Sequence, residues 1–309
     1  MKKPVALAAI AALATLSLAA CSDPEPAPQN ADDTNASNEE VVAGYDTSGI
    51  ETVEEIANLV PQEVKDRGVL RNGASTDYAP AEFRAADGHT PVGYDIEIVK
   101  ALAKVMGLEE GETQHAEFPT IIPSLGSKFD IGASSFTITA ERLDQVNMVS
   151  YVEVGSSYAV KKGNPNEFNP DDPCGTTIGV QTGTYQHDYA NELSEKCVAD
   201  GKEKITVMPH DLNTDSVTKL IGGQYDAVLS DSTVTGYAIS KKSDELEQAG
   251  DVIESEPQGI AINKADTELT EAVHKAMQYL MDEGILKEIL AIYGADSAAL
   301  STSEVNPGQ

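Results

Sequence analysis

Hydrophobic residues follow two alternating patterns from about residue 64 to residue 295. Short apolar runs bounded by small or polar residues predict buried strands, and apolar residues spaced three or four positions apart predict helices. The predicted strands are Val69–Gly73, Phe129–Ala133, Thr177–Val180, Ile205–Met208 and Tyr225–Leu229. The predicted helices are Asp95–Met106, a short one from Ile121, one from Thr139, one after Gly183, Ser216–Ile221 and Leu269–Tyr293. Strands that alternate with helices in two successive sets indicate an α/β protein with mostly parallel sheets.

The first 21 residues follow a different pattern. Lys2 and Lys3 precede an apolar run that reaches Ala20, which is typical of a secretory signal and too short for a transmembrane helix. The run ends in Leu18-Ala19-Ala20-Cys21, which resembles a bacterial lipobox. We therefore expect residues 1–20 to be a lipoprotein signal peptide and the thiol of Cys21 to carry a lipid on the extracytoplasmic face of the cell membrane. The alternative is an ordinary signal peptide beside a cysteine that occurs there by chance.

Two segments contain too little apolar surface to fold by themselves. An acidic, proline-rich stretch follows Cys21, and we predict that residues 21–63 form a solvated linker between the anchor and the folded part. Residues 296–309 are predicted to form a disordered tail.

The charge of the chain limits its partners. The sequence contains 51 acidic and 21 basic residues, a formal net charge of −30. Such a protein is repelled by nucleic acid phosphates, so we expect no nucleic-acid partner. It is also repelled by an anionic membrane surface, which makes a covalent anchor the means of attachment. The simplest interpretation of the acidity is a soluble, charged surface, and we expect a monomer.

Two cysteines remain once Cys21 carries a lipid. Cys174 and Cys197 form a pair in an exported protein, which predicts a disulfide. The alternative is a metal site, but none of the five histidines lies at ligand spacing from a cysteine. We therefore expect no metal and no cofactor.

The segment from Gly132 to Arg142 contains the most informative candidate site. It leads from a buried strand through small hydroxyl residues to a helix capped by Thr139, and Arg142 falls in the first turn of that helix. A cation there faces the positive end of the helix dipole, and a bound anion reverses that penalty. A carboxylate fits the guanidinium best because it accepts two parallel hydrogen bonds. The alternative is a surface ion pair of Arg142 with Glu141 or Asp144, and the spacing alone does not decide between them.

Several motifs recur in the order found in one family. The chain resembles the family 3 polar-amino-acid solute-binding proteins of ABC transporters from about residue 64 to residue 295. Each motif is weak alone, and their joint order carries the resemblance. The matching pieces are Gly68-Val69-Leu70, Tyr78-Ala79-Pro80, Gly93-Tyr94-Asp95, Ile122-Pro123-Ser124-Leu125, Thr139-Ala140-Glu141-Arg142, Gly183-Thr184, Tyr225-Asp226-Ala227 with Asp231, and Asp282-Glu283-Gly284.

The resemblance implies which residues hold the backbone groups of an amino acid. Arg142 would bind the ligand α-carboxylate, together with Thr137 and the backbone of Thr184. Ser135 and Asp231 would receive the α-ammonium group. Asp231 has an alternative role as a polar turn residue at the end of a strand.

The resemblance also implies how the ligand side chain is held. Tyr78 and Phe118 would flank it, since aromatic faces bind at low entropic cost and attract cations. The alternatives are core packing for Phe118 and loop packing for Tyr78. Ser75 stands where some relatives that bind cationic amino acids have an acidic group, and Gln181 stands where the glutamine-type site has a lysine. No spare basic residue is evident for an acidic ligand, so a polar or cationic side chain is favoured.

The implied architecture is the two-lobed, type II periplasmic-binding-protein-like fold. Lobe 1 would comprise residues 64–150 and 259–295, and lobe 2 residues 156–254. Two crossings, near Tyr151–Gly155 and Ser255–Gln258, would form a hinge that closes the lobes around a ligand. The closed form would then be recognised by an ABC permease in the membrane.

Two other functions remain possible on the same fold. An exported dehydratase-like enzyme would need a general acid or base, for which Glu82 and His115 are the candidates. No second catalytic partner lies at a suitable spacing, so we expect a protein that is not an enzyme. A binding protein that reports to a signalling receptor would have the same sequence features as a transport protein.

Overall fold

A computed structural model describes residues 44–308, all within one compact unit. The predicted signal peptide, the predicted lipid site at Cys21 and the linker up to residue 43 lie outside the described residues. Within residues 44–308, no helix is both long enough and apolar enough to cross a membrane.

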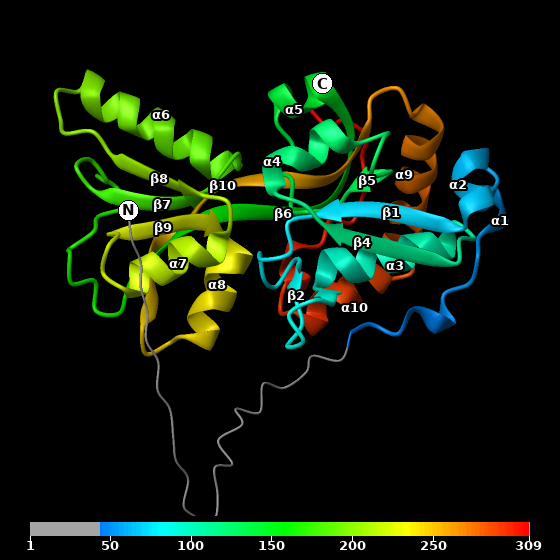
Figure 1. Cartoon of the computed structure of the whole chain (residues 1–309), viewed down its shortest axis with the longest axis horizontal. Helices are drawn as coiled ribbons and strands as arrows, with labels where there is room; N and C mark the ends of the chain where they lie inside the picture. Colours follow the sequence, from blue (N-terminus) through cyan, green and yellow to red (C-terminus); the bar gives the residue numbers. More distant parts are fainter. Residues whose placement is uncertain (1–43, 309) are drawn as a thin grey trace, which may run out of the picture. The chain divides into compact units, whose positions relative to one another are not determined.

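One eight-stranded sheet runs through the described unit in the order β4-β1-β5-β10-β6-β9-β7-β8 (Figure 1). We call the part built on β4, β1 and β5 the first half and the part built on β9, β7 and β8 the second half. Within each half these strands pair in parallel, as predicted, whereas β10 is antiparallel to β5 and β6, and β6 is antiparallel to β9. The strands are β1 (Val69–Ala74), β4 (Glu110–His115), β5 (Ile131–Gly132), β6 (Val146–Lys161), β7 (Thr177–Gln181), β8 (Thr206–His210), β9 (Ala227–Asp231) and β10 (Leu246–Asn263); β2 (Phe83–Arg84) and β3 (Pro91–Val92) form a separate hairpin.

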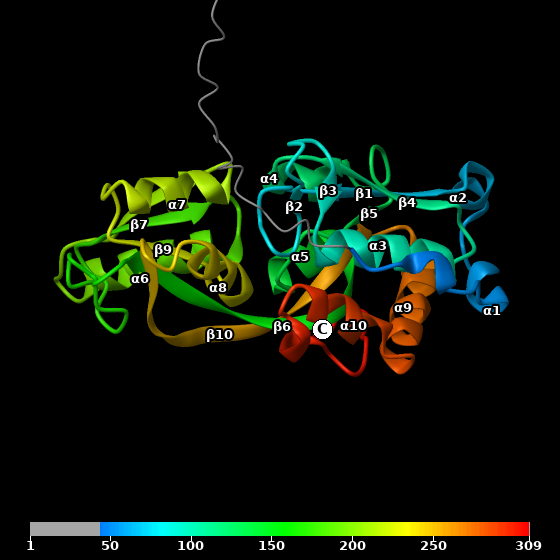
Figure 2. The ribbon, with the colours of Figure 1, turned by 90° about the horizontal axis from the view of Figure 1, so that it is seen from below.

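The long strands β6 and β10 belong to both halves (Figure 2). Their antiparallel pairing extends from Asn263 opposite Val146 to Leu246 opposite Lys161. The register of this pairing shifts at three places. Two of the shifts flank the short paired segment that begins with Glu256 opposite Val154 and ends with Gln258 opposite Val152. Such irregularities bend a strand locally. Both predicted crossings lie inside this paired segment, and its action as a hinge remains a prediction.

Helices cover both halves of the sheet. In the first half, α3 buries an apolar face against α9 and α10, in line with its helical periodicity. In the second half, α6, α7 and α8 cover two smaller apolar clusters. The helices are α1 (Glu54–Ala57), α2 (Gln62–Arg67), α3 (Tyr94–Val105), α4 (Phe118–Ile121), α5 (Ala140–Gln145), α6 (Tyr185–Ala199), α7 (Asn213–Ile221), α8 (Ser232–Lys241), α9 (Thr267–Asp282) and α10 (Ile285–Ile292), with 3-10 turns η1 (Thr47–Gly49), η2 (Ile122–Ser124) and η3 (Asp296–Ala298).

The prediction of one helix over Leu269–Tyr293 is wrong. Helix α9 ends at Asp282, and α10 begins at Ile285. Gly284 separates them with φ = 75°, a left-handed conformation that glycine adopts without steric cost and that terminates helices. The apolar periodicity continued past this break because both helices pack on the same core.

The predicted limits of the folded part are also wrong at both ends. Residues 44–63, assigned to the linker, form η1, α1 and the start of α2, and they bury Ile56 and Val60 in the first half. Residues 296–308, assigned to a disordered tail, lie along β6. Val305 bridges to Val149, and the hydroxyl of Ser303 donates to the carbonyl of Ser150. Backbone pairing with a central strand orders this polar segment, which local composition does not reveal.

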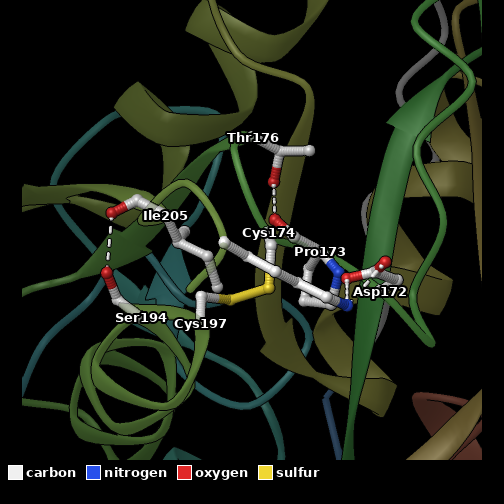
Figure 3. The surroundings of a disulfide bond; sticks show 8 residues. Asp172, Pro173, Cys174, Thr176, Ser194, Cys197 and Ile205 are labelled. Atoms are coloured by element: carbon white, nitrogen blue, oxygen red, sulfur yellow. Dashed lines mark hydrogen bonds and ion pairs between the residues drawn. A yellow bond between two sulfur atoms is a disulfide. The ribbon is translucent and has the colours of Figure 1, made fainter. Parts of the chain in front are cut away.

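The predicted disulfide between Cys174 and Cys197 is present in the second half (Figure 3). It joins the loop before β7 to the last turn of α6, and Cys197 is buried. Hydrogen bonds from Thr176 to Pro173 and from Ser194 to Ile205 hold the same region. A bridge across 23 positions stabilises the fold by about 3 kcal/mol in the chain-entropy model.

Candidate functional site

The candidate site lies where loops at strand ends and helix starts from both halves meet. A narrow cavity of about 10 Å³, enough for roughly one water molecule, contains eight of the nine predicted ligand-binding residues in its wall. The ninth, Ser75, accepts a hydrogen bond from Nε2 of Gln181 at 3.0 Å and so adjoins the wall. The lining residues are Tyr78, Phe118, Ser135, Thr137, Arg142, Gln181, Thr184, Tyr185, Gln186 and Asp231. Residues up to 153 positions apart in sequence thus converge on one cavity.

Arg142 is a buried cation without a counterion in the described part of the chain. It lies in α5, where the hydroxyl of Thr139 caps the helix by accepting from the backbone N–H of Arg142. None of the ion pairs within residues 44–308 includes Arg142, so it pairs with neither Glu141 nor Asp144. Burial lowers the pKa of Arg142 to about 10. This guanidinium is charged at neutral pH and poorly solvated, which is the state that favours binding of an anion.

Two carbonyl groups and two aromatic rings hold the guanidinium of Arg142. Nη1 donates to the carbonyl of Thr137 at 2.6 Å, and Nη2 donates across the cleft to the carbonyl of Gly183 at 3.2 Å. The rings of Phe118 and Phe136 stack with centroids 4.5 Å apart, and both lie within about 5.5 Å of the guanidinium carbon. These contacts orient the group and leave N–H donors for a further acceptor.

The start of helix α6 provides the opposite side of the cavity. Thr184 caps α6 by accepting from the backbone N–H of His187, and the first turn places Gln186 in the cavity wall. Gly183 has φ = 75°, and a Cβ there would lie 3.2 Å from Pro119 of the first half. Glycine therefore permits both the turn and the close approach of the two halves.

Asp231 is the buried acid of the second half. It ends β9, and its two carboxylate oxygens accept from Nε2 of Gln186 and Nε2 of Gln258, each at 2.7 Å. Its backbone N–H donates to the hydroxyl of Tyr78 from the first half at 3.0 Å. Burial raises the pKa of Asp231 to about 7, despite the amide donors and the charge of Arg142. Asp231 is a strand-end residue, and it also lines the cavity.

Ser135 connects the cavity to a buried pair of carboxyl groups. It has φ = 52°, which is uncommon for a non-glycine residue. In this conformation its backbone N–H donates to Asp95 at 2.8 Å and its hydroxyl donates to Glu82 at 3.2 Å. Burial, and next the charge of Asp95, raise the pKa of Glu82 well above its ordinary value. Burial also raises the pKa of Asp95 to about 6, although the hydroxyl of Tyr151 donates to it at 2.7 Å.

The aromatic candidates combine both of the roles proposed for them. Phe118 belongs to a core cluster with Phe136 and also lines the cavity. Tyr78 is buried, and it contacts the second half through its hydroxyl. Packing and cavity lining are thus not exclusive at these positions.

Sequence reasoning missed three polar residues at the site. Tyr185 and Gln186 follow Thr184 in the first turn of α6 and line the cavity, and Gln258 orients Asp231. A helix start at Gly183 was predicted, and its next residues could have been included for that reason. Gln258 carried no local signal, because it reaches Asp231 only through the pairing of distant strands.

Known proteins are similar to this chain over most of its length. The family model described as "Bacterial extracellular solute-binding proteins, family 3" matches residues 70–296. The arginine-binding protein ArgT of Corynebacterium glutamicum is 33% identical over 265 residues, which are 85% of this chain and 86% of the relative.

Two solved structures are similar in fold as well as in sequence. One is a mutant of ArgBP from T. maritima, with a TM-score of 0.67, 31% identity, and coverage of 77% of this chain and 98% of the other. The second is the amino acid ABC transporter substrate-binding protein AbpA from Streptococcus pneumoniae bound to L-arginine. It has a TM-score of 0.67, 27% identity, and coverage of 76% of this chain and 99% of the other.

The absence of a counterion for Arg142 within residues 44–308 leads to a stability prediction. Arg142→Met removes a poorly solvated charge but also two hydrogen bonds to carbonyl groups, so the two effects should nearly cancel and the free energy of unfolding should change by less than about 1 kcal/mol. Asp130→Asn is the comparison, because Asp130 is buried and accepts from Arg67 and Arg71. Its loss should cost about 2 kcal/mol. Urea unfolding of the ligand-free variants measures both values, and a larger cost for Arg142→Met would identify Arg142 as a structural cation.

Proposed function

The chain belongs to family 3 of the bacterial extracellular solute-binding proteins, and we propose that it binds a cationic amino acid, with L-arginine as the first candidate. In this proposal it is the extracytoplasmic binding subunit of an ABC importer. Names of relatives support the choice, since ArgT is called arginine-binding and AbpA is described in complex with L-arginine.

The balance of buried charge in the cleft is the observation that carries the choice of a cationic ligand. Arg142 is the basic residue of the cavity wall. Asp231 lines the same cavity, and Glu82 and Asp95 accept from Ser135. A ligand with one carboxylate and two cationic groups complements this arrangement, whereas an acidic ligand adds a second anion near three carboxyl groups.

Each predicted ligand contact has a counterpart in the chemistry of the cavity. We assign the α-carboxylate to Arg142, assisted by Thr137 and the backbone of Thr184 at the start of α6. The α-ammonium is assigned to Asp231 and Ser135. The side chain then extends between Tyr78 and Phe118.

We assign the far end of the ligand side chain to the remaining polar groups near the cavity. Ser75 and Gln181 provide hydrogen bonds there. Burial raises the pKa values of Glu82 and Asp95, and the charge of Asp95 raises the pKa of Glu82 further. This favours a proton shared by the pair when no cation is bound, and the pair would supply negative charge once a cation binds. A guanidinium would draw the shared proton from this carboxyl pair, because it stabilises the ionised forms.

Closure around the ligand is proposed to occur by bending of β6 and β10 near Tyr151–Gly155 and Ser255–Gln258. Three features support this: the register shifts in that region, the hydrogen bond between Tyr78 and Asp231, and the one between Arg142 and Gly183. Binding without turnover is proposed as well. Glu82 is held by Ser134 and Ser135, whereas His115 contacts Thr76 and is not part of the cavity wall.

The predicted ligand can be tested by isothermal titration calorimetry with L-arginine, L-lysine, L-glutamine and L-glutamate. We expect L-arginine to bind at least about ten-fold more tightly than L-glutamate. Arg142→Met should weaken binding about a hundred-fold or more, because it removes two charge-assisted hydrogen bonds. Arg67→Met, which removes a cation that contacts Asp130 and Glu63, is the matched control and should keep the wild-type affinity. Preference for L-glutamate, or binding that survives Arg142→Met, would contradict the proposal.

The pKa of Asp231 predicts a dependence of affinity on pH. Its value of about 7 applies to the ligand-free form, and a bound ammonium group lowers it, so binding releases a proton below pH 7. The contribution of ionised Asp231 to the binding free energy is complete above pH 7 and is lost as the pH falls. Affinity should therefore be about ten-fold weaker at pH 6 than at pH 8.

Calorimetry in buffers of different ionisation enthalpy measures this slope and the proton release together. Asp95 and Asp77 have pKa values of about 6, so they add a second step at lower pH. Asp231→Asn should remove the step near pH 7 and keep the lower one. Retention of both steps would assign the dependence to other groups.

The anchor is proposed to be a lipid on Cys21. A bacterial culture supplied with labelled palmitate should incorporate the label into the wild-type protein, which should partition into membranes. Cys21→Ser should lose both the label and the membrane association, because it removes the attachment point of the lipid. Stable membrane anchoring requires two acyl chains, and without them the protein dissociates from the membrane. Membrane association of the unlabelled variant would contradict this assignment.

A further inference from the structure

Helix α7 of the second half lacks a side-chain cap of its own. It extends over nine residues, Asn213–Ile221, and Leu212 at its N-cap position offers no hydrogen-bonding side chain. The neighbouring helix α6 is capped by Thr184 and α9 of the first half by Asp266, whereas α8 of the second half, like α7, has no side-chain cap. The first backbone N–H groups of an uncapped helix need acceptors, and the helix dipole favours a negative charge beside them.

A carboxylate from the first half occupies this position. Oδ2 of Asp77 accepts from the backbone N–H of Thr214 at 3.4 Å, a long hydrogen bond, and Asn213 contributes a second backbone donor. Asp77 is partly buried and lies in the loop that follows β1, on the opposite side of the cleft from α7. Its carboxylate is thus placed where a cap from within the second half would normally lie.

Further hydrogen bonds connect this contact to the ligand cavity. The hydroxyl of Ser75 donates to Oδ1 of Asp77 at 3.0 Å, and Nε2 of Gln181 donates to the same hydroxyl at 3.0 Å. Gln181 also donates to the carbonyl of Asp211, which lies just before α7. Two residues of the first half are therefore joined to two segments of the second half, beside the ligand site.

We propose that Asp77 caps α7 across the cleft and thereby stabilises the closed arrangement of the two halves. This rests on the proposed function only in taking closure to accompany ligand binding. Asp77 is a positioning residue here: it does not contact the ligand, and it sets affinity by favouring the closed form. Opening of the cleft separates Asp77 from α7, and both the carboxylate and the N–H groups return to water.

Other charged groups near this contact oppose it in part. Asp211 and Asp215 flank the start of α7, and the charge of Asp215 adds to the effect of burial, which raises the pKa of Asp77 to about 6. Asp77 is ionised above that pH and then acts as a charged cap. Tests at about pH 8 therefore examine the capping form.

The first experiment compares Asp77→Ala with the wild type in titrations of L-arginine and L-glutamine. Loss of a helix cap corresponds to about five-fold weaker binding. If Asp77 acts as a cross-cleft cap, its removal should weaken binding of both ligands by the same factor and raise the dissociation rate in stopped-flow measurements. If Asp77 contacted the cationic side chain directly, L-arginine would be weakened and L-glutamine would not, which would overturn the proposal. Asp66→Ala, at an exposed aspartate on α2, is the control.

The second experiment supplies α7 with a cap of its own. Leu212→Ser places a hydroxyl at the N-cap position, and Leu212→Asn serves the same purpose. In either background Asp77→Ala should weaken binding less than two-fold, because the N–H groups keep an acceptor within the second half. An undiminished five-fold loss would overturn the proposal.

A third measurement does not depend on the identity of the ligand. Small-angle X-ray scattering of ligand-free Asp77→Ala should give a larger radius of gyration than that of ligand-free wild type. An unchanged radius would overturn the cap. If the wild type binds none of the tested amino acids, the proposed function fails, and the scattering comparison still decides the role of Asp77.

Discussion

The antiparallel pairing of β6 with β10 is the constraint on which the remaining structure depends. These two strands are shared by both halves, so the sheet of each half is built outward from them. β5 pairs with the last residues of β10, and β9 pairs with residues 156–159 near the end of β6. Consequently the ends of β1 and β5 in one half face the ends of β7 and β9 in the other, and the loops at these ends form one cavity. Two of the three register shifts of β10 lie between the two attachments, where the proposed change of angle would move one half against the other.

The burial of charged groups in the cleft follows from the meeting of these loops. Each half contributes charged groups that water would solvate on an open surface. These groups lose that solvation, at a cost in free energy, when the halves meet. Arg142 loses solvent without acquiring an ion pair in the described residues, and Asp231, Asp95 and Glu82 are buried with their pKa values raised. Natural proteins tolerate such groups at functional sites, because the cost is offset when a ligand of complementary charge binds. The stability of the ligand-free closed form and the affinity for a ligand are therefore linked through the same side chains.

Much of the fold could be predicted from local sequence. The strands at Val69–Ala74 and Thr177–Gln181 and the helix at Tyr94–Val105 have apolar patterns that depend only on their own residues. The polar strand Glu110–His115 was missed, because an edge strand that is mostly exposed carries no apolar pattern. The strands β6 and β10 were not predicted either, since the pairing of residues about a hundred positions apart defines them. The helix that ends at Asp282 was extended too far, because apolar spacing does not show the backbone conformation of Gly284.

By itself, the sequence determined the nature and order of the parts. Only the resemblance to a family pointed to the aromatic residues Tyr78 and Phe118. Residue type and local pattern indicated an α/β chain, an exported cysteine pair, and an arginine at the start of a helix that follows small hydroxyl residues. These features depend on residue type and on neighbours within a few positions, so they can be recognised without a structure. The tertiary structure alone decided that Arg142 has no counterion within residues 44–308, that Gln258 orients Asp231 and that Asp77 lies at the start of α7. Those facts depend on solvent exposure and on the distance between segments far apart in the chain, which only long-range strand pairing determines.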